Sequence, residues 1–230
     1  MKIGIIGLKN SGKTTVFNAL TGLNAEITTY TSTKAEPNLG IVEVIDERLT
    51  KLAEMYEQEK AVYAHIEFMD FIGFSEHITE SEIFSSSFMT LAKTADAIAV
   101  VVRNFESDIF TDTLSPIRDI ETIESELIIS DFIIAEKRLE KIELSKKRGI
   151  KDAQLLLEEK VIRKAIENLN NSIPLRDLSL NNEEEMAIRG FQFISQKPVM
   201  IILNSKESNF HQNESLIQEI GRKYKVIEFA

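Results

Sequence analysis

Gly7-Leu8-Lys9-Asn10-Ser11-Gly12-Lys13-Thr14 is the stretch of sequence that decides the fold. Its spacing is G-x-x-x-x-G-K-[ST], which is typical of a loop that binds phosphate groups. The apolar run at residues 2–6 predicts a buried strand before the loop, and residues 15–20 predict a helix after it. In that order, backbone N–H groups and the positive end of the helix dipole face a bound anion. The stretch therefore predicts a P-loop that holds the phosphates of a nucleotide.

The individual P-loop residues have separate expected roles. We expect Asn10, Ser11, Gly12 and Thr15 to line the nucleotide. Lys13 is expected to reach the β- and γ-phosphates and to take part in catalysis, and the Thr14 hydroxyl is expected to bind Mg²⁺. The alternative is a glycine turn with a chance lysine, and the flanking strand and helix disfavour it.

Composition limits the classes of protein that the chain can represent. Its 230 residues are 43% hydrophobic, enough for one large core or one core with a smaller unit. The net charge of −10 argues against a protein that coats nucleic acid, so no DNA partner is expected. No apolar run reaches about 18 residues, the length of a membrane span, and the first strand begins too early for a leader peptide. Because the chain has no cysteine, disulfides are excluded, and a cytoplasmic location is expected.

Apolar runs and alternating patterns predict the rest of a sheet. The run at 97–102 is apolar throughout, as in a central parallel strand that is covered on both faces. We expect further strands at 40–45, 62–69, 199–203 and 225–229, a short helix at 48–56 and a polar loop at 24–34.

The segment between the strands at 97–102 and 199–203 has a different pattern. Ile128, Phe132, Ala135, Leu139 and Ile142 are spaced by four and three residues, as in the seam of a coiled coil. The pattern resumes after Gly149 and ends before Pro174, which predicts two antiparallel helices joined by a turn. A third helix is expected from 182 to 193. We therefore expect a nucleotide-binding domain at 1–115 and 196–230, interrupted by a helical insertion at 116–195.

A second motif ends the strand at 62–69. Asp70 and Gly73 form the D-x-x-G pattern of P-loop GTPases, in which the aspartate acts at Mg²⁺ and the glycine N–H contacts the γ-phosphate. Both are candidate catalytic residues, and Asp70 is with Thr14 a candidate metal-site residue. The alternative is an ordinary strand-ending aspartate and turn glycine. Phe74 follows, where GTPases carry a glutamine that orients water, so hydrolysis is expected to use another group, to be slow or to be absent.

A third motif follows the strand at 199–203. Asn204-Ser205-Lys206-Glu207 stands where GTPases have N-K-x-D, whose aspartate accepts two hydrogen bonds from guanine. Ser205 replaces the lysine that lies along the base. In Glu207 the extra methylene moves the carboxylate by roughly one C–C bond length, which weakens a bidentate contact. We expect Asn204, Ser205 and Glu207 at the nucleotide and a preference for adenine over guanine; the alternative is a generic strand-to-turn segment.

These motifs, in this order, resemble the Obg-like ATPases, the YchF family. Further blocks that carry the resemblance are Glu36-Pro37-Asn38-Leu39-Gly40-Ile41-Val42 and Arg118-Asp119-Ile120-Glu121-Thr122-Ile123. The resemblance implies an α/β fold of the P-loop NTPase G-domain type, in which a mostly parallel sheet is flanked by helices and a coiled-coil insertion projects from it. It also implies ATP or GTP as ligand with Mg²⁺, hydrolysis without the usual glutamine, and association with ribosomes.

The basic end of the insertion fits a ribosome or RNA contact, expected between 137 and 151. The alternative is a solvated helix face. The cations that outnumber the acids there are Lys137, Arg138, Lys141, Lys146, Lys147, Arg148 and Lys151.

The chain departs from the family pattern where γ-phosphate sensing is expected. Lys34 stands in place of the threonine expected at Mg²⁺, although Thr31 or Thr33 could replace it, and residues 74–85 lack the family's glycines. The sequence also ends before the family's C-terminal TGS domain. These departures predict a short, diverged member.

Three functions fit this pattern. The first is a Mg²⁺-dependent nucleoside triphosphatase that acts on ATP. The second is a nucleotide-binding interaction module that has lost hydrolysis and docks through its helical hairpin, and the third, a GTPase-like switch, is disfavoured by Ser205 and Glu207.

Overall fold

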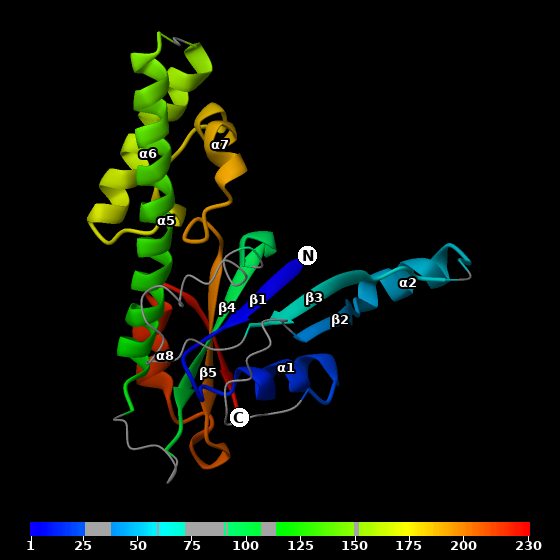
Figure 1. Ribbon diagram of the computed structural model, residues 1–230. Coiled ribbons are helices and arrows are strands. Elements are labelled where there is room, and N and C mark those ends of the chain that lie inside the picture. The colour runs from blue at the N-terminus through cyan, green and yellow to red at the C-terminus, as the bar shows by residue number, and fades with distance from the viewer. Residues whose placement is uncertain (26–37, 59, 72–89, 91, 107–113, 150–151) are drawn as a thin grey trace.

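A mostly parallel sheet forms the centre of the molecule in the computed structural model, which describes residues 1–25, 38–58, 60–71, 90, 92–106, 114–149 and 152–230 (Figure 1). The order of its six described strands is β2-β3-β1-β4-β5-β6. Only the β2–β3 pairing is antiparallel. The strands are β1 (Lys2–Ile6), β2 (Asn38–Val44), β3 (Ala64–Asp70), β4 (Ala97–Asn104), β5 (Val199–Ser205) and β6 (Lys225–Phe229).

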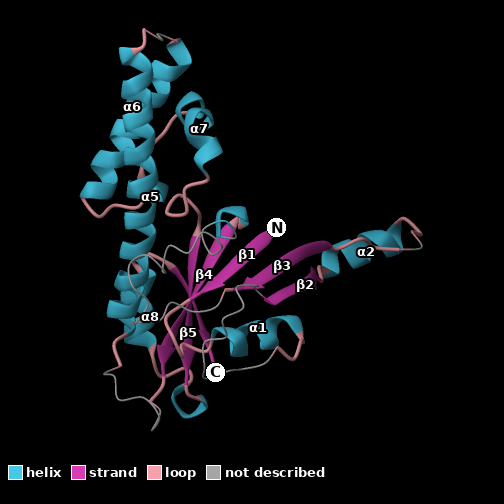
Figure 2. Cartoon of the chain, viewed as in Figure 1, coloured by secondary structure: helices cyan, strands magenta, loops and turns pink. Residues whose placement is uncertain are grey.

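Helices cover both faces of the sheet (Figure 2). Helix α1 (Lys13–Thr21) packs Val16 and Phe17 against one face, and α5 (Pro116–Lys147) and α8 (Glu214–Gly221) pack against the other. Successive β4 residues serve opposite cores, because Ala99 and Val101 face α1 whereas Val100 and Val102 face α5. This explains why β4 is apolar throughout, and it confirms the predicted α/β fold class.

Helix α5 connects the sheet to a helical hairpin. Its first turns place Ile120, Ile123 and Leu127 in the core of the sheet, and from Ile128 onward it packs on α6 (Ala153–Asn170). Gly149, with a φ of 86°, follows the end of α5, as a helix stop requires. Figure 1 shows the two helices rising side by side away from the sheet. The division at residue 116 remains a prediction, since one continuous helix contributes to both cores.

The remaining helices are short. Helix α7 (Asn182–Ile188) is followed by the 3₁₀ turn η2 (Arg189–Phe191), where a single helix was predicted for 182–193. Helix α2 (Glu47–Met55), predicted at 48–56, lies at the far end of the β2–β3 pair (Figure 1) and buries none of its residues. Helix α8 was not predicted. Across the described ranges, no helix is long and apolar enough to cross a membrane.

Candidate nucleotide-binding site

The candidate site lies at the carboxyl ends of three parallel strands. The loop after β1, Asp70 at the end of β3 and Asn204 at the end of β5 meet at this edge of the sheet. The chain leaves β1 between β3 and β4, which lie on opposite sides of it. In open α/β sheets, ligands bind at such a switch point outside the carboxyl ends of the strands.

The loop between β1 and α1 has the backbone of a phosphate cradle. Asn10 and Gly12 have φ angles of 61° and 90°, and the Ser11 N–H donates to the Leu8 carbonyl at 3.3 Å. Helix α1 begins at Lys13 without a side-chain cap, so its first N–H groups remain available to an anion. A Cβ on Gly12 would overlap Asn204 Nδ2, so the loop has room only for glycine there.

Lys13 is held inside this loop. Its side chain is buried, and its ammonium group donates to the Leu8 carbonyl at 2.8 Å. Burial lowers the pKa of Lys13 from 10.5 to about 8, and the attraction of Asp70 opposes that shift. A phosphate placed at this ammonium would replace a weak neutral acceptor by a charged one.

Asp70 and Thr14 are in direct contact, and their assignment to one metal site stays a prediction. The Thr14 hydroxyl donates to Asp70 Oδ2 at 2.8 Å, and the Asn38 amide donates to the same oxygen at 3.2 Å. The other oxygen, Asp70 Oδ1, is buried and has no hydrogen-bond partner within the described ranges. Burial raises the pKa of Asp70, against the hydrogen bonds of Thr14 and Asn38 and the charge of Lys13. A free carboxylate oxygen beside a hydroxyl suits Mg²⁺, which prefers hard oxygen ligands and keeps several waters.

Asn204 contributes to the loop itself. Its amide donates to the Ser11 carbonyl at 2.9 Å and is buried, so it ties the end of β5 to the phosphate cradle. Ser11 also carries a buried hydroxyl oxygen for which the described residues offer no partner. Two buried polar atoms of the site, Ser11 Oγ and Asp70 Oδ1, thus have no partner among the described residues, which is energetically costly unless a polar group occupies the site.

The base-recognition segment makes contacts within the protein that its motif does not indicate, and its expected role at the base stays a prediction. The Ser205 hydroxyl donates to Glu228 Oε1 at 2.8 Å and accepts hydrogen bonds from Asn104 at 3.0 Å and Asn213 at 3.3 Å. The Asn213 amide has two N–H groups and shorter contacts with Glu228 Oε1 and the Asn209 carbonyl, so Asn104 is the main donor to the Ser205 hydroxyl. Glu207 lies exposed in the 3₁₀ turn η3 (Glu207–Asn209).

Three polar residues of the site were not identified from the sequence. Asn38 belongs to the E-P-N block that was quoted for its family resemblance, so a signal existed for it. Asn213 and Glu228 follow no motif, and only the fold brings them together beside the end of β5.

Some predicted site residues lie outside the described ranges, namely Gly73 and Phe74 together with Thr31, Thr33 and Lys34. Their expected roles at the γ-phosphate and the metal stay predictions. Thr15, which was expected to line the nucleotide, is exposed on the first turn of α1.

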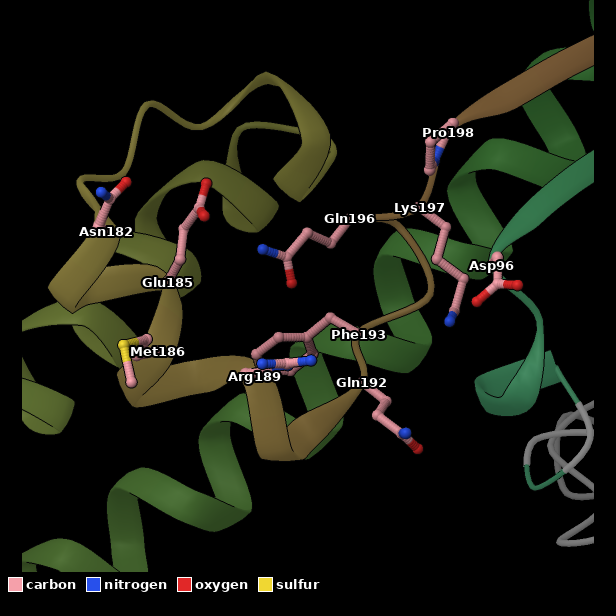
Figure 3. Close-up of a pocket in the computed structure, with 10 residues that line it drawn as sticks. All are labelled: Asp96, Asn182, Glu185, Met186, Arg189, Gln192, Phe193, Gln196, Lys197 and Pro198. Atoms are coloured by element: carbon pink, nitrogen blue, oxygen red, sulfur yellow. The ribbon is translucent and has the colours of Figure 1, made fainter. Parts of the chain in front are cut away.

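A separate cavity of about 690 Å³ lies at the opposite edge of the sheet. Figure 3 shows Asp96 and Lys197, which precede β4 and β5, on one side and Asn182 and Glu185 of α7 on the other. The Lys197 ammonium is occupied, because it donates to the carbonyls of Lys93 and Ala95. Because its lining lies before the amino ends of β4 and β5, this cavity is distinct from the nucleotide site at the carboxyl ends of the strands.

The strand order, with a phosphate cradle directly after its central β1, defines the class: a P-loop nucleotide-binding domain of the GTPase type. The model of the family described as "50S ribosome-binding GTPase" matches residues 2–138. That is more than half of the chain, and the chain therefore belongs to this family.

Within the family, the chain is a relative of the YchF proteins. It is 35% identical to "Ribosome-binding ATPase YchF" of Pasteurella multocida, over 96% of this chain and 62% of that one. It is 35% identical to the protein of that name from Bacillus subtilis, over 89% of this chain and 56% of the relative. The solved structure of the Schizosaccharomyces pombe YchF GTPase is 27% identical, with a TM-score of 0.76, over 100% of this chain and 65% of that one. The chain thus spans about three fifths of the length of the relatives that it matches.

Proposed function

We propose that this chain binds a nucleoside triphosphate with Mg²⁺ and hydrolyses it slowly. The observation that carries the proposal is the convergence of Lys13, Thr14 and Asp70 at one edge of the sheet. In this arrangement the Lys13 ammonium donates to a neutral carbonyl, that of Leu8. The buried Asp70 Oδ1 has no hydrogen-bond partner among the described residues.

Each residue has a separate part in the proposed site. Lys13 binds the β- and γ-phosphates, the first N–H groups of α1 bind the remaining phosphate oxygens, and Thr14 and Asp70 hold Mg²⁺ directly or through water. The metal ion neutralises charge that develops on the phosphates. Asn204 keeps the loop in place through the Ser11 carbonyl.

We propose ATP as the preferred nucleotide. Ser205 stands where a lysine would lie along guanine, and its hydroxyl is hydrogen-bonded to Glu228 and Asn104 within the protein. The names of the relatives do not decide the question, since the curated proteins are called ATPases and the solved neighbour is called a GTPase.

Titration calorimetry of ATP, ADP, GTP and GDP in the presence of Mg²⁺ tests the binding proposal, with Lys13→Ala as the control. We expect adenine nucleotides to bind more tightly and the Lys13→Ala variant to lose the phosphate-dependent part of the affinity. Tighter binding of GDP than of ADP would reject the proposed preference for adenine. If no nucleotide binds, the proposed nucleotide-binding function is rejected.

Single-turnover hydrolysis separates the enzyme from the interaction module. A slow rate that disappears in Lys13→Ala supports a triphosphatase. Tight ATP binding with no turnover supports the module that docks through its hairpin.

We further propose that the end of the hairpin contacts the ribosome, which would place the protein in the cytoplasm. The relatives are named for ribosome binding. Arg138 and Lys146 are held by Glu158 and Glu159 of α6. Lys151 lies outside the described residues, and the remaining cations of this end, which are exposed, are Lys137, Lys141, Lys147 and Arg148. The proposed contact is therefore the exposed end of the hairpin, formed by the last turns of α5 and by Arg148, which follows them.

A further inference from the structure

Glu228 closes a polar network beside the nucleotide site that none of the known motifs includes. It lies on β6, whose residues pair with β5 so that Glu228 stands opposite Leu203. Its Oε1 accepts hydrogen bonds from the Ser205 hydroxyl at 2.8 Å and the Asn213 amide at 2.5 Å. Its Oε2 accepts the backbone N–H of His211 at 3.1 Å.

These hydrogen bonds hold both ends of the loop between β5 and α8. Ser205 ends β5 where the loop begins, and His211 and Asn213 lie where it ends, just before α8. The loop between them, residues 206–210, carries Glu207, the residue expected at the base. Asn213 also donates to the Asn209 carbonyl at 2.9 Å, so the network reaches into η3 itself.

The network also fixes the loop relative to the rest of the sheet. Asn104 at the end of β4 donates to Ser205, and so β4, β5 and β6 are joined through one hydroxyl. The neighbouring Asn204 holds the P-loop. Two adjacent residues of β5 thus have different roles. Asn204 positions the phosphate cradle, and Ser205 together with Glu228 positions the loop after the strand.

The carboxylate is suited to this role. Burial opposes its ionisation, but the hydrogen bonds from Asn213, Ser205 and the His211 N–H lower the pKa of Glu228 on balance. Charged acceptors make stronger hydrogen bonds than neutral ones, so an ionised Glu228 holds three donors from two loop ends firmly.

We propose that Glu228 is the positioning residue for base discrimination: by fixing loop 206–210 at both ends, it sets where Glu207 meets the base of the nucleotide. The inference rests on the proposed nucleotide binding. It adds that the base and the phosphates are read by separable parts of the site. Loss of Glu228 then removes base discrimination and leaves phosphate binding intact.

Calorimetry with ADP, GDP and inorganic pyrophosphate, each with Mg²⁺, tests this separation. We expect Glu228→Ala to weaken the binding of ADP by about tenfold, equivalent to about 1.4 kcal/mol of binding free energy. The ratio of the ADP and GDP affinities should move toward one. Pyrophosphate affinity should stay within about twofold, since no base is present. Glu228→Gln keeps the shape and one carbonyl oxygen, so it should retain more of the ratio. Glu219→Ala removes an exposed carboxylate of α8 and should change nothing.

The outcomes separate the inference from the function on which it rests. An unchanged ADP:GDP ratio in Glu228→Ala, or an equal weakening of ADP and pyrophosphate, overturns the positioning role alone. A wild-type chain that binds none of the three ligands overturns the proposed function as well. If Glu228→Ala does not fold, Ser205→Ala supplies the same test, because it removes the link between β5 and Glu228 and should lower the same ratio.

Discussion

At the scale of single residues, the site holds charges that the free protein stabilises poorly. Burial lowers the pKa of Lys13 and raises the pKa of Asp70, so each group is shifted toward its neutral form. Such paired shifts are common at functional sites. A bound nucleotide with Mg²⁺ would add opposite charges beside both groups, beyond their attraction to each other, and ligand binding should therefore be coupled to protonation.

Nucleotide affinity should fall as the pH rises above the pKa of Lys13. That pKa is about 8 in the free protein, and phosphate charge raises it in the complex. Below about pH 7 the lysine is charged in both states and the pH has little effect. Above about pH 8, binding takes up a proton and the dissociation constant rises by up to about tenfold per pH unit.

Calorimetry at about pH 9 in two buffers of different ionisation enthalpy measures this proton uptake, which we expect to approach about one per nucleotide. Lys13→Ala should bind weakly with no uptake. For the wild type, an affinity that stays the same from about pH 7 to about pH 9 would contradict the assignment of Lys13 to the phosphates.

Gly12 is favoured both by its backbone conformation and by the limited space beside it, and alanine variants at three glycines separate the two effects. In Gly12→Ala the alanine would have a φ of 90° and would overlap Asn204 Nδ2, whereas in Gly22→Ala it would have only an unfavourable φ of 68°. In Gly190→Ala neither problem arises. A positive φ costs an alanine about 1–2 kcal/mol. We expect Gly190→Ala to be near neutral in urea denaturation, Gly22→Ala to lose about that amount, and Gly12→Ala to lose more.

Nucleotide binding provides the second readout for these variants. Only Gly12→Ala displaces Asn204 from the Ser11 carbonyl, so only this variant should lose ADP affinity. Equal losses of affinity in Gly12→Ala and Gly22→Ala would show that the contact with Asn204 is not important.

At the scale of elements, the sequence predicts those parts whose pattern is local. The bounds of β1 and β6 agree with the structure, and β4 and β5 extend two residues beyond the predicted strands. Helix α8 was missed because Leu216, Ile217 and Ile220 are too few to define a periodic face.

The same limit applies to long-range packing. Ile120, Ile123 and Leu127 continue the apolar spacing of the later α5 residues, yet they pack on the sheet. Periodicity shows that a helix face is buried but not which partner buries it. For the site, motif spacing identified Thr14 and Asp70, which do meet, whereas the network around Glu228 depends on the pairing of β5 with β6 and has no local signal.

Asp131 of α5 is hydrogen-bonded to the segment that leads into β5, and its contribution to folding stability should depend on pH. Its carboxylate accepts the N–H groups of Ile194 at 3.0 Å and Ser195 at 2.6 Å and is fully buried. Burial raises its pKa from 3.8 to about 6, more than the hydrogen bonds and Lys93 lower it. Between about pH 4 and 6 the folded state therefore binds a proton that the unfolded state has lost, and stability falls as the pH rises.

Urea denaturation of the wild type and Asp131→Asn from about pH 4 to 7 measures this contribution. The free energy of unfolding of the wild type, relative to the variant, should fall by up to about 1.4 kcal/mol per pH unit between about pH 4 and 6 and level off above that. Glu121→Gln, on the exposed side of the same helix, should follow the wild type. Parallel curves for the wild type and Asp131→Asn would show that Asp131 has an ordinary pKa in the folded protein.

At the scale of the whole molecule, charge is unevenly distributed. The net charge is −10, yet Lys137, Lys141 and Arg148 are exposed in the last turns of α5 and just after them, far from the sheet. A protein of this charge is repelled by RNA on average, so any contact with the ribosome must come from a local basic surface. The hairpin carries these residues toward its end that projects away from the sheet (Figure 1).

The proposed ribosome binding should therefore depend on the position of these cations and not on their number. The triple variant Lys137→Ala, Lys141→Ala, Arg148→Ala and the control triple Lys51→Ala, Arg222→Ala, Lys225→Ala each remove three exposed positive charges, which changes the net charge from −10 to −13 in both. Bulk repulsion is thus matched, and only the hairpin surface differs.

Sedimentation with purified ribosomes over a salt series should show weaker binding for the hairpin triple alone. Its salt slope should fall by roughly 0.7–0.9 for each RNA phosphate that the variant no longer neutralises. Equally weakened binding in the two triples would mean that overall charge governs the association, and an unchanged hairpin triple would move the ribosome-binding surface elsewhere on the protein.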